Sequence, residues 1–261
     1  TKNSLKGRRI KKLGGKQGAI RVRESVKVRV AAVGDIHSPR YLDVLLEAVK
    51  DTLEVDVIML AGDVVHKGKV DEYTRVLDLL EEHVDAPIIA CFGNEEYEDL
   101  HEEIKELCGG RVVFLEEEAF VVNVGSVSLG VVGSKGSLDR PTWWQSKNIP
   151  NIKEIYAERV ERVKEAVSKL NTTYKGILTH YAPTYCNLEG ENPSAWPEMA
   201  SKKYEPVLEK VDFAVHGHAH RGKTFCEFKG VPVFNVALPA TRKITVFEVP
   251  AGKIRLDAFF G

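Results

Sequence analysis

The chain has 261 residues, of which 43% are hydrophobic, and its formal net charge is −1. A chain of this length suits one large domain or two small ones, and it buries enough apolar surface to fold without disulfides. The composition excludes collagen-like and disordered proteins, and no apolar run approaches the about 18 residues that a membrane-spanning helix needs.

The near-neutral charge conceals a basic first segment. Residues 1–29 hold eleven Lys or Arg and one acid, whereas the other 232 residues hold 26 basic and 37 acidic residues. No apolar signal core accompanies the basic start, so we expect a cytoplasmic protein. A basic arm suits either contact with nucleic acid or a solvated tail, and we favour the tail. We therefore predict a basic, in part poorly ordered extension over residues 1–25 and one domain over residues 26–261.

The first half of the chain alternates strand and helix patterns. An alternating pattern that begins at Ile20 and the apolar runs that follow predict strands at residues 20–33, 55–61 and 88–92. Apolar residues at helical spacing predict helices at residues 42–53, 71–84 and 100–108. This alternation predicts a parallel sheet with covering helices.

The second half carries shorter strands and longer loops. Strands are predicted at residues 111–114, 118–124, 126–132, 176–178 and 211–215. The clearest helix is predicted at residues 151–170, and it lies between loops at 133–150 and 181–206. Residues 223–260 read as four strands, which suits an antiparallel second sheet.

The cysteines and three of the histidines are expected to be structural. The four cysteines form no Cys-x-x-Cys pair, which argues against a zinc ribbon or a thioredoxin-type site. We expect buried reduced thiols at Cys91, Cys108, Cys186 and Cys226. His216 is expected to end a buried strand, and the helical His83 and His101 to face solvent.

Metal-type side chains follow five of the predicted strands, just after each strand ends. They are Asp35, His37, Asp63, Asn94, His180, His218 and His220. Ligands of open α/β sheets bind beyond the carboxyl ends of the strands, so we expect these side chains at one rim. The set is large enough for two divalent cations that share one carboxylate. Mixed nitrogen and oxygen ligands favour Mn, Fe, Zn or Ni over Mg or Ca.

The order of these motifs resembles that of the calcineurin-like metallophosphoesterases. The matching segments are Asp35-x-His37, Gly62-Asp63, Gly93-Asn94, His180 and Gly217-His218-Ala219-His220. The resemblance implies a four-layer α/β/β/α sandwich of two mixed sheets flanked by helices, with the metal site at the carboxyl ends of strands. It also implies one ion held by Asp35, His37 and His220, a second held by Asn94, His180 and His218, and a bridging Asp63.

The reaction that this resemblance implies is hydrolysis of a small phosphate ester. Two metal ions about 3.5–4 Å apart generate a hydroxide that attacks phosphorus and neutralise charge on the phosphoryl oxygens. The catalytic residues would then include Asp63 and Asn94.

One residue departs from the family pattern Gly-Asn-His-Asp/Glu, because Glu95 stands in place of its histidine. An ionised carboxylate would repel a phosphate dianion, and a protonated one would act as an acid only with a raised pKa. A third alternative is that Glu95 points away from the site. His66 is a candidate to replace the missing acid. We expect phosphodiesters as substrates, since a diester carries a single negative charge at phosphorus.

The loop at 133–150 holds the candidates for substrate contact. Arg140 is a candidate phosphate ligand, and Trp143 and Trp144 are candidates for stacking on a base or sugar. The alternative for the two tryptophans is that they anchor the loop in the core.

Two other functions remain open. A nuclease would bind a polyanion through Lys and Arg, which the acidic body disfavours and only the basic arm would supply. A non-catalytic scaffold of the same fold is disfavoured because all seven expected ligands are present. No membrane partner is expected.

Overall fold

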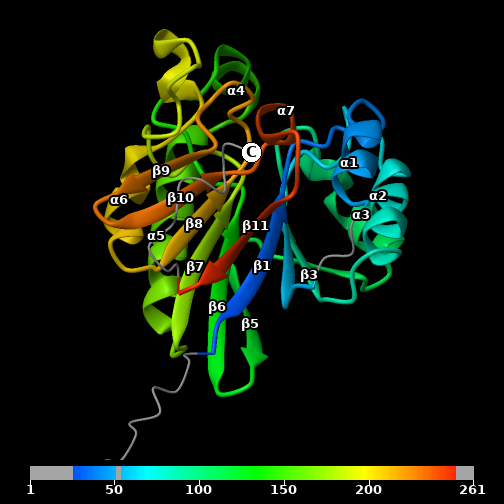
Figure 1. The fold of residues 1–261 in the computed structure, drawn as a ribbon. Helices are drawn as coiled ribbons and strands as arrows, with labels where there is room; N and C mark the ends of the chain where they lie inside the picture. The colour runs from blue at the N-terminus through cyan, green and yellow to red at the C-terminus, as the bar shows by residue number, and fades with distance from the viewer. Residues whose placement is uncertain (1–25, 51–53, 251–261) are drawn as a thin grey trace, which may run out of the picture.

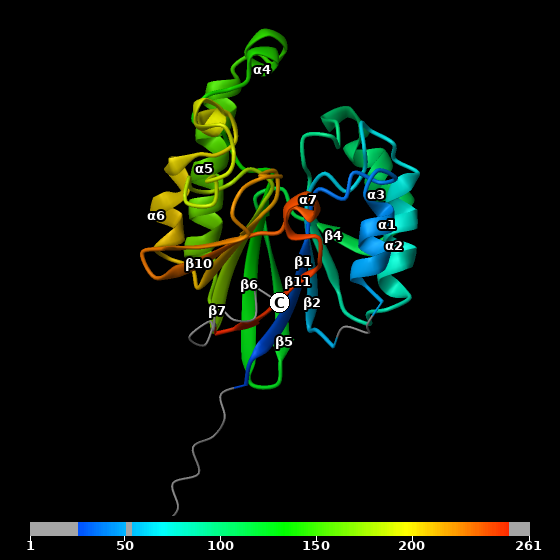
Figure 2. The same cartoon turned by 45° about the horizontal axis from the view of Figure 1, so that its top comes forward.

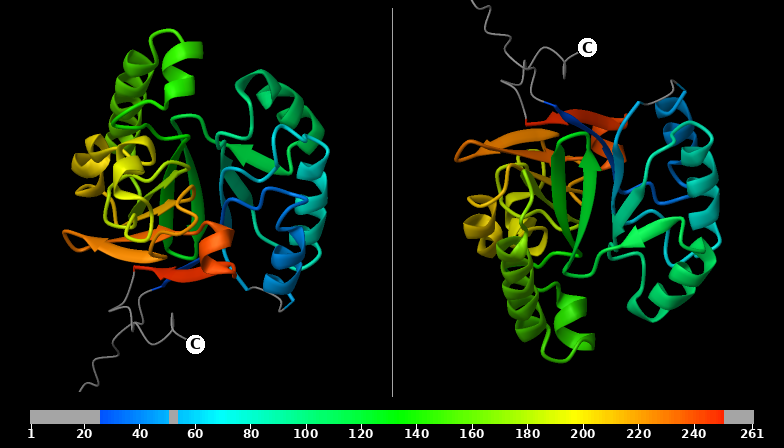
Figure 3. Two further views of the ribbon diagram at one scale, coloured as in Figure 1. Left: turned by 90° about the horizontal axis from the view of Figure 1, so that it is seen from above. Right: turned by 90° about the horizontal axis from the view of Figure 1, so that it is seen from below.

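The computed structural model describes residues 26–50 and 54–250, which form two sheets with helices outside both (Figure 1). Seen from above, the layers follow the order helices, sheet, sheet, helices (Figure 3). The predicted four-layer sandwich of mixed sheets is thereby confirmed. The predicted extension over residues 1–25 lies outside the described residues.

The first sheet has the strand order β11-β1-β2-β3-β4. Its strands are β1 (Val28–Val33), β2 (Val57–Ala61), β3 (Ile88–Cys91), β4 (Val112–Phe114) and β11 (Thr245–Val249). The strands β1 to β4 run parallel, as the alternation of strands and helices predicts. Its outer face is covered by α1 (Leu42–Ala48), α2 (Glu72–Glu81) and α3 (His101–Cys108), and the short 3₁₀ helix η1 (Glu98–Leu100) leads into α3.

The second sheet has the order β5-β6-β7-β8-β10-β9. Its strands are β5 (Glu118–Val124), β6 (Val127–Ser134), β7 (Tyr174–Thr179), β8 (Phe213–His216), β9 (Phe225–Phe228) and β10 (Val231–Asn235). The helices of this half are α4 (Trp143–Asn148), α5 (Ile152–Lys169) and α6 (Glu205–Leu208), with 3₁₀ helices η2 (Pro193–Glu198) and η3 (Lys202–Tyr204). The short α7 (Leu238–Thr241) lies between β10 and β11.

Apolar spacing explains the longest helix and the layer between the sheets. Helix α5 buries side chains four, four, three and four residues apart, namely Ile152, Tyr156, Val160, Val163 and Val167. Between the sheets, side chains from both strand sets pack together, including Met59, Ile89, Leu178, Val215 and Phe234. The two sheets therefore share one apolar layer, which holds their strand ends in a common position.

The last strands do not form the separate antiparallel sheet that the sequence predicts. β9 and β10 pair antiparallel, but β10 continues the second sheet by pairing parallel with β8. β11 instead returns to the first sheet, where it lies antiparallel to β1 with Val28 opposite Val249. The chain thus crosses from the second sheet to the first between β10 and β11, and β11 forms an edge of the first sheet. The expected fourth strand of this region would extend past residue 250, outside the described residues.

Two structural expectations for single residues are wrong. Cys186 and Cys226 are joined in a disulfide across 40 residues of sequence, whereas Cys91 and Cys108 are free and buried as expected. His101 is buried rather than exposed, because its ring stacks on Phe92. Among the described residues, none of the helices has the length and hydropathy of a membrane-spanning segment.

Candidate metal centre

The seven predicted ligands meet where the two sheets adjoin. Three strand ends of the first sheet (β1, β2, β3) and two of the second (β7, β8) face the same rim. Asp35, His37, Asp63 and His218 have φ values of 53°, 45°, 50° and 67°, a backbone region that non-glycine residues avoid. Such strain is concentrated at functional sites, where the surrounding structure compensates for it.

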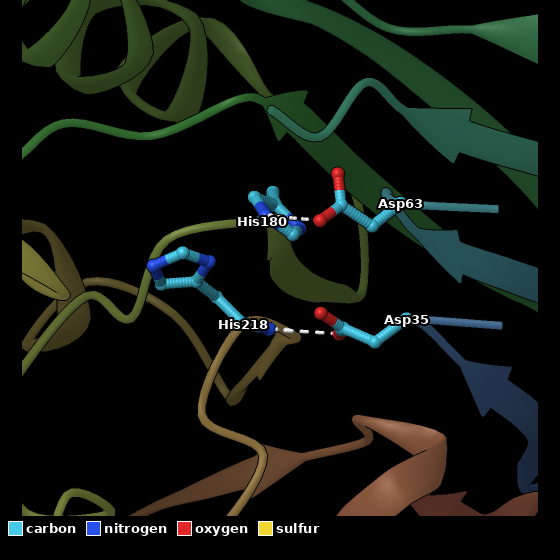
Figure 4. A group of neighbouring side chains, drawn as sticks. All are labelled: Asp35, Asp63, His180 and His218. Atoms are coloured by element: carbon cyan, nitrogen blue, oxygen red, sulfur yellow. Dashed lines mark hydrogen bonds and ion pairs between the residues drawn. The ribbon is translucent and has the colours of Figure 1, made fainter. Parts of the chain in front are cut away.

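Besides the group formed by His37, His66 and Glu95, two overlapping groups of potential ligand atoms are present among the described residues. In one, the ligand atoms of Asp35, Asp63, His180 and His218 all lie within 4.8 Å of one another (Figure 4). In the other, Asp35, His37 and His220 are equally close. Figure 4 shows the two carboxylates extending from the first sheet toward the two imidazoles of the second. The centre therefore exists only when both sheets are assembled.

Asp63 lies between the two predicted sets of ligands. Its Oδ2 is 3.8 Å from His37 Nε2 and 3.6 Å from His180 Nε2. Asn94 completes the second set, with its Oδ1 lying 3.0 Å from His180 Nε2. Asp35 accepts a hydrogen bond from the His218 backbone N–H at 2.8 Å, and its Oδ1 lies 2.9 Å from His220 Nε2.

The side chains of this cluster offer more hydrogen-bond acceptors than N–H donors. The His180 Nδ1–H donates to the Ala61 carbonyl at 2.9 Å, so a neutral ring presents a bare Nε2 to the oxygens of Asn94 and Asp63. The His37 Nδ1–H likewise donates to Glu95 at 3.1 Å and leaves its Nε2 to the centre. Acceptors that face acceptors in a buried site need a cation, and this donor set fits divalent metal ions.

Burial controls the protonation of the imidazoles. Removal from water lowers the pKa of His180 to about 4 and that of His218 to about 3, so both rings are neutral and free to act as ligands at pH 7. Burial and the neighbouring charges of Glu96 and Asp35 raise the pKa of Asp63 well above its usual value. For Asp35, burial acts in the same direction, but the bond to His220 and the nearby imidazoles lower its pKa overall.

Glu95 borders the site, where it contacts the proposed ligand His37 on the side of its Nδ1. Its Oε2 lies 2.8 Å from His66 Nδ1, 3.1 Å from His37 Nδ1 and 2.9 Å from the Lys67 N–H, which donates to it. Burial opposes ionisation, yet these donors together lower the pKa of Glu95 below its usual value. Because Glu95 contacts a proposed ligand, the alternative that it points away from the site is wrong, and its lowered pKa favours the ionised carboxylate.

Glu96 is a buried residue of the site that sequence reasoning missed. Its carboxylate accepts hydrogen bonds from the backbone N–H groups of Asp63, Val64, Val65 and Gly93 at 2.6–3.1 Å. It thus ties the turn after β2 to the turn after β3 and holds Asp63 in its left-handed conformation. Glu96 occupies the fourth position of the family pattern Gly-Asn-His-Asp/Glu, and this match is the feature of the sequence that could have identified it.

The three substrate-contact candidates differ in their surroundings. Arg140 binds Glu198 at 2.9 Å and the Ser194 carbonyl at 2.7 Å, so its guanidinium ties two loops together. Trp143 and Trp144 are 74% and 60% exposed, so the alternative that they anchor the loop in the core is wrong. They belong to α4, which projects beyond α5 in Figure 2.

Comparison with known proteins places this geometry in context. Residues 28–222 match the model of a protein family described as calcineurin-like phosphoesterase. One solved chain superimposes with a TM-score of 0.60 at 12% sequence identity, over 86% of this chain and 96% of that chain. TT1561 of Thermus thermophilus superimposes with a TM-score of 0.52 at 16% identity, over 85% of this chain and 98% of that chain. These two superpositions show a shared fold alone. Among curated protein sequences, none matches this chain.

Proposed function

The chain belongs to the calcineurin-like phosphoesterase family, whose members are hydrolases of phosphoester-type bonds, and we propose that it is a phosphodiesterase with two divalent metal ions. The observation that supports this is the convergence of bare imidazole nitrogens and carboxylate oxygens at one rim. One ion would be held by Asp35, His37 and His220, and the other by Asn94, His180 and His218, with Asp63 shared. Manganese, iron, zinc and nickel all suit such ligands.

Divalent cations bound there supply Lewis-acid chemistry, by polarising phosphoryl oxygens and acidifying water. The protein positions the ligands for this chemistry. Glu95 orients His37 through its Nδ1–H, and the Ala61 carbonyl orients His180 in the same way. Both rings are thereby held with Nε2 toward the centre.

His66 is the residue that we propose as proton donor to the leaving oxygen. Its Nδ1 lies 2.8 Å from Glu95 Oε2, so the carboxylate orients the ring through the Nδ1–H, and the doubly protonated imidazolium would donate its second proton from Nε2. In this arrangement Glu95 and His66 together take the place of the single histidine of the family pattern.

The preference for diesters follows from charge. The ionised Glu95 adds a negative charge beside those of Asp35 and Asp63, which themselves offset bound cations. A monoester brings two negative charges to this rim and a diester only one, so the carboxylate penalises the monoester more.

The test compares two chromogenic esters, bis(p-nitrophenyl) phosphate and p-nitrophenyl phosphate, with Mn, Fe, Zn and Ni supplied in turn. We expect hydrolysis of the diester to exceed that of the monoester, with about two ions bound per chain by elemental analysis. Asp63→Asn should lose activity by about a thousandfold, because it removes the shared carboxylate, while the exposed Asp43→Asn serves as the matched control. If the wild type binds two ions but hydrolyses neither ester, and is thus as inactive as Asp63→Asn, the proposed phosphodiesterase activity is contradicted.

A further inference from the structure

A lysine occupies the same rim as the proposed ligands. Lys135 directly follows β6, and β6 runs parallel to β7 with Ser134 opposite Thr179. Lys135 therefore stands at the next level along the sheet, opposite His180, and its carbonyl accepts the Tyr181 N–H at 3.0 Å. The carboxyl end of β6 thus brings a cation to a rim where the other strand ends bring metal-type ligands.

The ammonium group of Lys135 is buried and incompletely neutralised. Its side chain is 15% exposed, and among the described residues its one carboxylate partner within 4 Å is Glu98, at 3.9 Å. Burial lowers the pKa of Lys135, whereas the charges of Glu98, Glu96 and Asp63 act to raise it. Burial is the main cause of the lowered pKa of His180, and the charge of Lys135 lowers it further.

A cleft opens beside this lysine. Lys135, Phe92, Glu98, His101 and Arg159 line a cavity of about 380 Å³. Phe92 immediately precedes the Gly93-Asn94 turn, so one wall of the cleft is continuous with the segment that carries a proposed ligand. Through Phe92 and Lys135 the cleft borders two of the segments that end at the rim.

The second cation of the cleft has its donors engaged. Arg159 donates to the Gly136 carbonyl at 2.9 Å, and its Nε lies 3.3 Å from a Glu117 oxygen. Arg140, the other candidate for phosphate contact, is bound to Glu198. Lys135 thus combines burial, a position beside His180 in the sheet and a carboxylate partner no closer than 3.9 Å among the described residues.

We propose that Lys135 binds an oxygen of the phosphate and that the adjoining cleft receives the leaving group. This rests on the proposed phosphoesterase function and adds a phosphate-binding residue to it. An ammonium in a water-poor site forms strong charge-assisted hydrogen bonds with phosphate oxygens. It offsets the repulsion that Glu95 introduces, and Glu98 competes for it from the solvent side of the cleft.

The experiment measures binding of inorganic phosphate to the full-length, manganese-loaded chain by calorimetry, so it needs no turnover. Lys135→Met keeps the apolar stem and should weaken phosphate binding by about tenfold or more, and Lys135→Arg should restore most of it. Lys153→Met, on the exposed surface of α5, is the matched control and should bind as the wild type does. Glu98→Gln should bind phosphate more tightly, by about twofold to fivefold, because it removes the competing carboxylate.

The outcomes separate this proposal from the proposed function. A chain that binds manganese and phosphate but hydrolyses no ester would contradict the function, and the Lys135 variants would still report on phosphate binding. Equal affinity in Lys135→Met and wild type overturns the proposal, and so does a wild type that binds no phosphate. If thermal unfolding shows that Lys135→Met does not fold, Glu98→Gln decides, since weaker or unchanged binding there overturns the proposal.

Discussion

At the level of single residues, Glu95 distinguishes this chain from the motif that it otherwise follows. Its carboxylate lies against His37 and His66, so it both orients a proposed ligand and adds charge to the site. These two effects have different consequences, because orientation alters metal affinity and charge alters the choice of ester.

We predict that Glu95→His raises the ratio of monoesterase to diesterase activity by roughly tenfold, because a carboxylate that repels the dianion is replaced by a donor. The ratio is measured with the paired chromogenic esters at equal metal content. Glu82→His, on the exposed end of α2, should leave the ratio unchanged. An unaltered ratio in the Glu95 variant would remove the charge argument for diesters.

Glu96 is the residue on which the two loops of the site depend most. Gln at this position would turn an amide N–H₂ toward backbone N–H groups that the carboxylate now satisfies. Glu96→Gln should therefore lower the free energy of unfolding by about 2–4 kcal/mol. Urea unfolding of the metal-free protein measures this, with Glu82→Gln as the exposed control. Equal stability of the two variants would show that the buried bonds contribute little.

At the level of elements, the turns after the strands set the geometry of the site. A Cβ added at Gly93 would collide with the Oδ1 and the backbone N of Asp63, so this turn accepts no side chain. The turn after β3 can thus approach the turn after β2 closely enough for Glu96 to join them.

Gly93→Ala should accordingly displace Asp63 and weaken metal binding by about tenfold or more. Gly110→Ala is the informative control. Gly110 has a φ of +83°, and no atom lies within 4 Å of a Cβ added there. The substitution should therefore lower the free energy of unfolding by only about 1 kcal/mol and leave metal affinity intact. Metal titration of both variants makes the comparison. Metal affinity that falls equally in both would indicate a general loss of folding, not a local collision.

Helix α4 contacts a residue that packs against a proposed metal ligand. Thr142 and Gln145 form a capping box at its start, and Gln145 Nε2 donates to the Tyr181 hydroxyl at 3.3 Å. The Tyr181 ring packs against His218, with ring centroids 4.9 Å apart. The exposed tryptophans of α4 are thus connected to the centre through one aromatic contact.

We predict that replacing Trp143 and Trp144 together with Ala raises KM for a diester with a nucleoside or aryl group by about fivefold or more, since stacking is worth about 1–3 kcal/mol per base. The melting temperature should change little, because both side chains are largely exposed. Dimethyl phosphate, which offers no ring, is the control substrate. A KM that is unchanged for every ester would exclude these residues from substrate binding.

At the scale of the whole molecule, burial of imidazoles couples stability to pH. His180, His216 and His218 have folded pKa values of about 4, 4 and 3, against 6.5 in the unfolded chain. Below pH 6.5 the unfolded chain therefore takes up protons that the folded chain does not, and stability is lost as pH falls. The raised pKa values of the buried Asp63 and Glu96 oppose this, because these two groups take up protons earlier in the folded chain than in the unfolded chain.

The free energy of unfolding of the metal-free protein should therefore fall by about 1–3 kcal/mol per pH unit between about pH 6 and 4.5. Urea unfolding at several pH values measures the slope. His216→Gln removes one of the three histidines without touching a proposed ligand, so it should flatten the dependence. Stability that stays constant or rises toward pH 4.5 would contradict neutral buried imidazoles.

The sequence by itself determined the local elements and the positions of the metal-type residues along the chain. Periodicity reflects which face of a helix or strand meets the core, so α2, α5 and the strands β1 to β3 were readable from apolar spacing. The ends of parallel strands share one edge of a sheet, so residues such as Asp63 and His180 could be expected to meet. The order of the motifs then indicated which residues belong to one centre.

Only the tertiary structure decided which distant segments pair. The return of β11 to the first sheet and the disulfide between Cys186 and Cys226 depend on contacts between residues remote in sequence. The same holds for the buried Glu96 and for Lys135, whose partners lie on other strands and turns. Spacing along one segment carries no information about such partners, because burial and register are settled when the two sheets pack together.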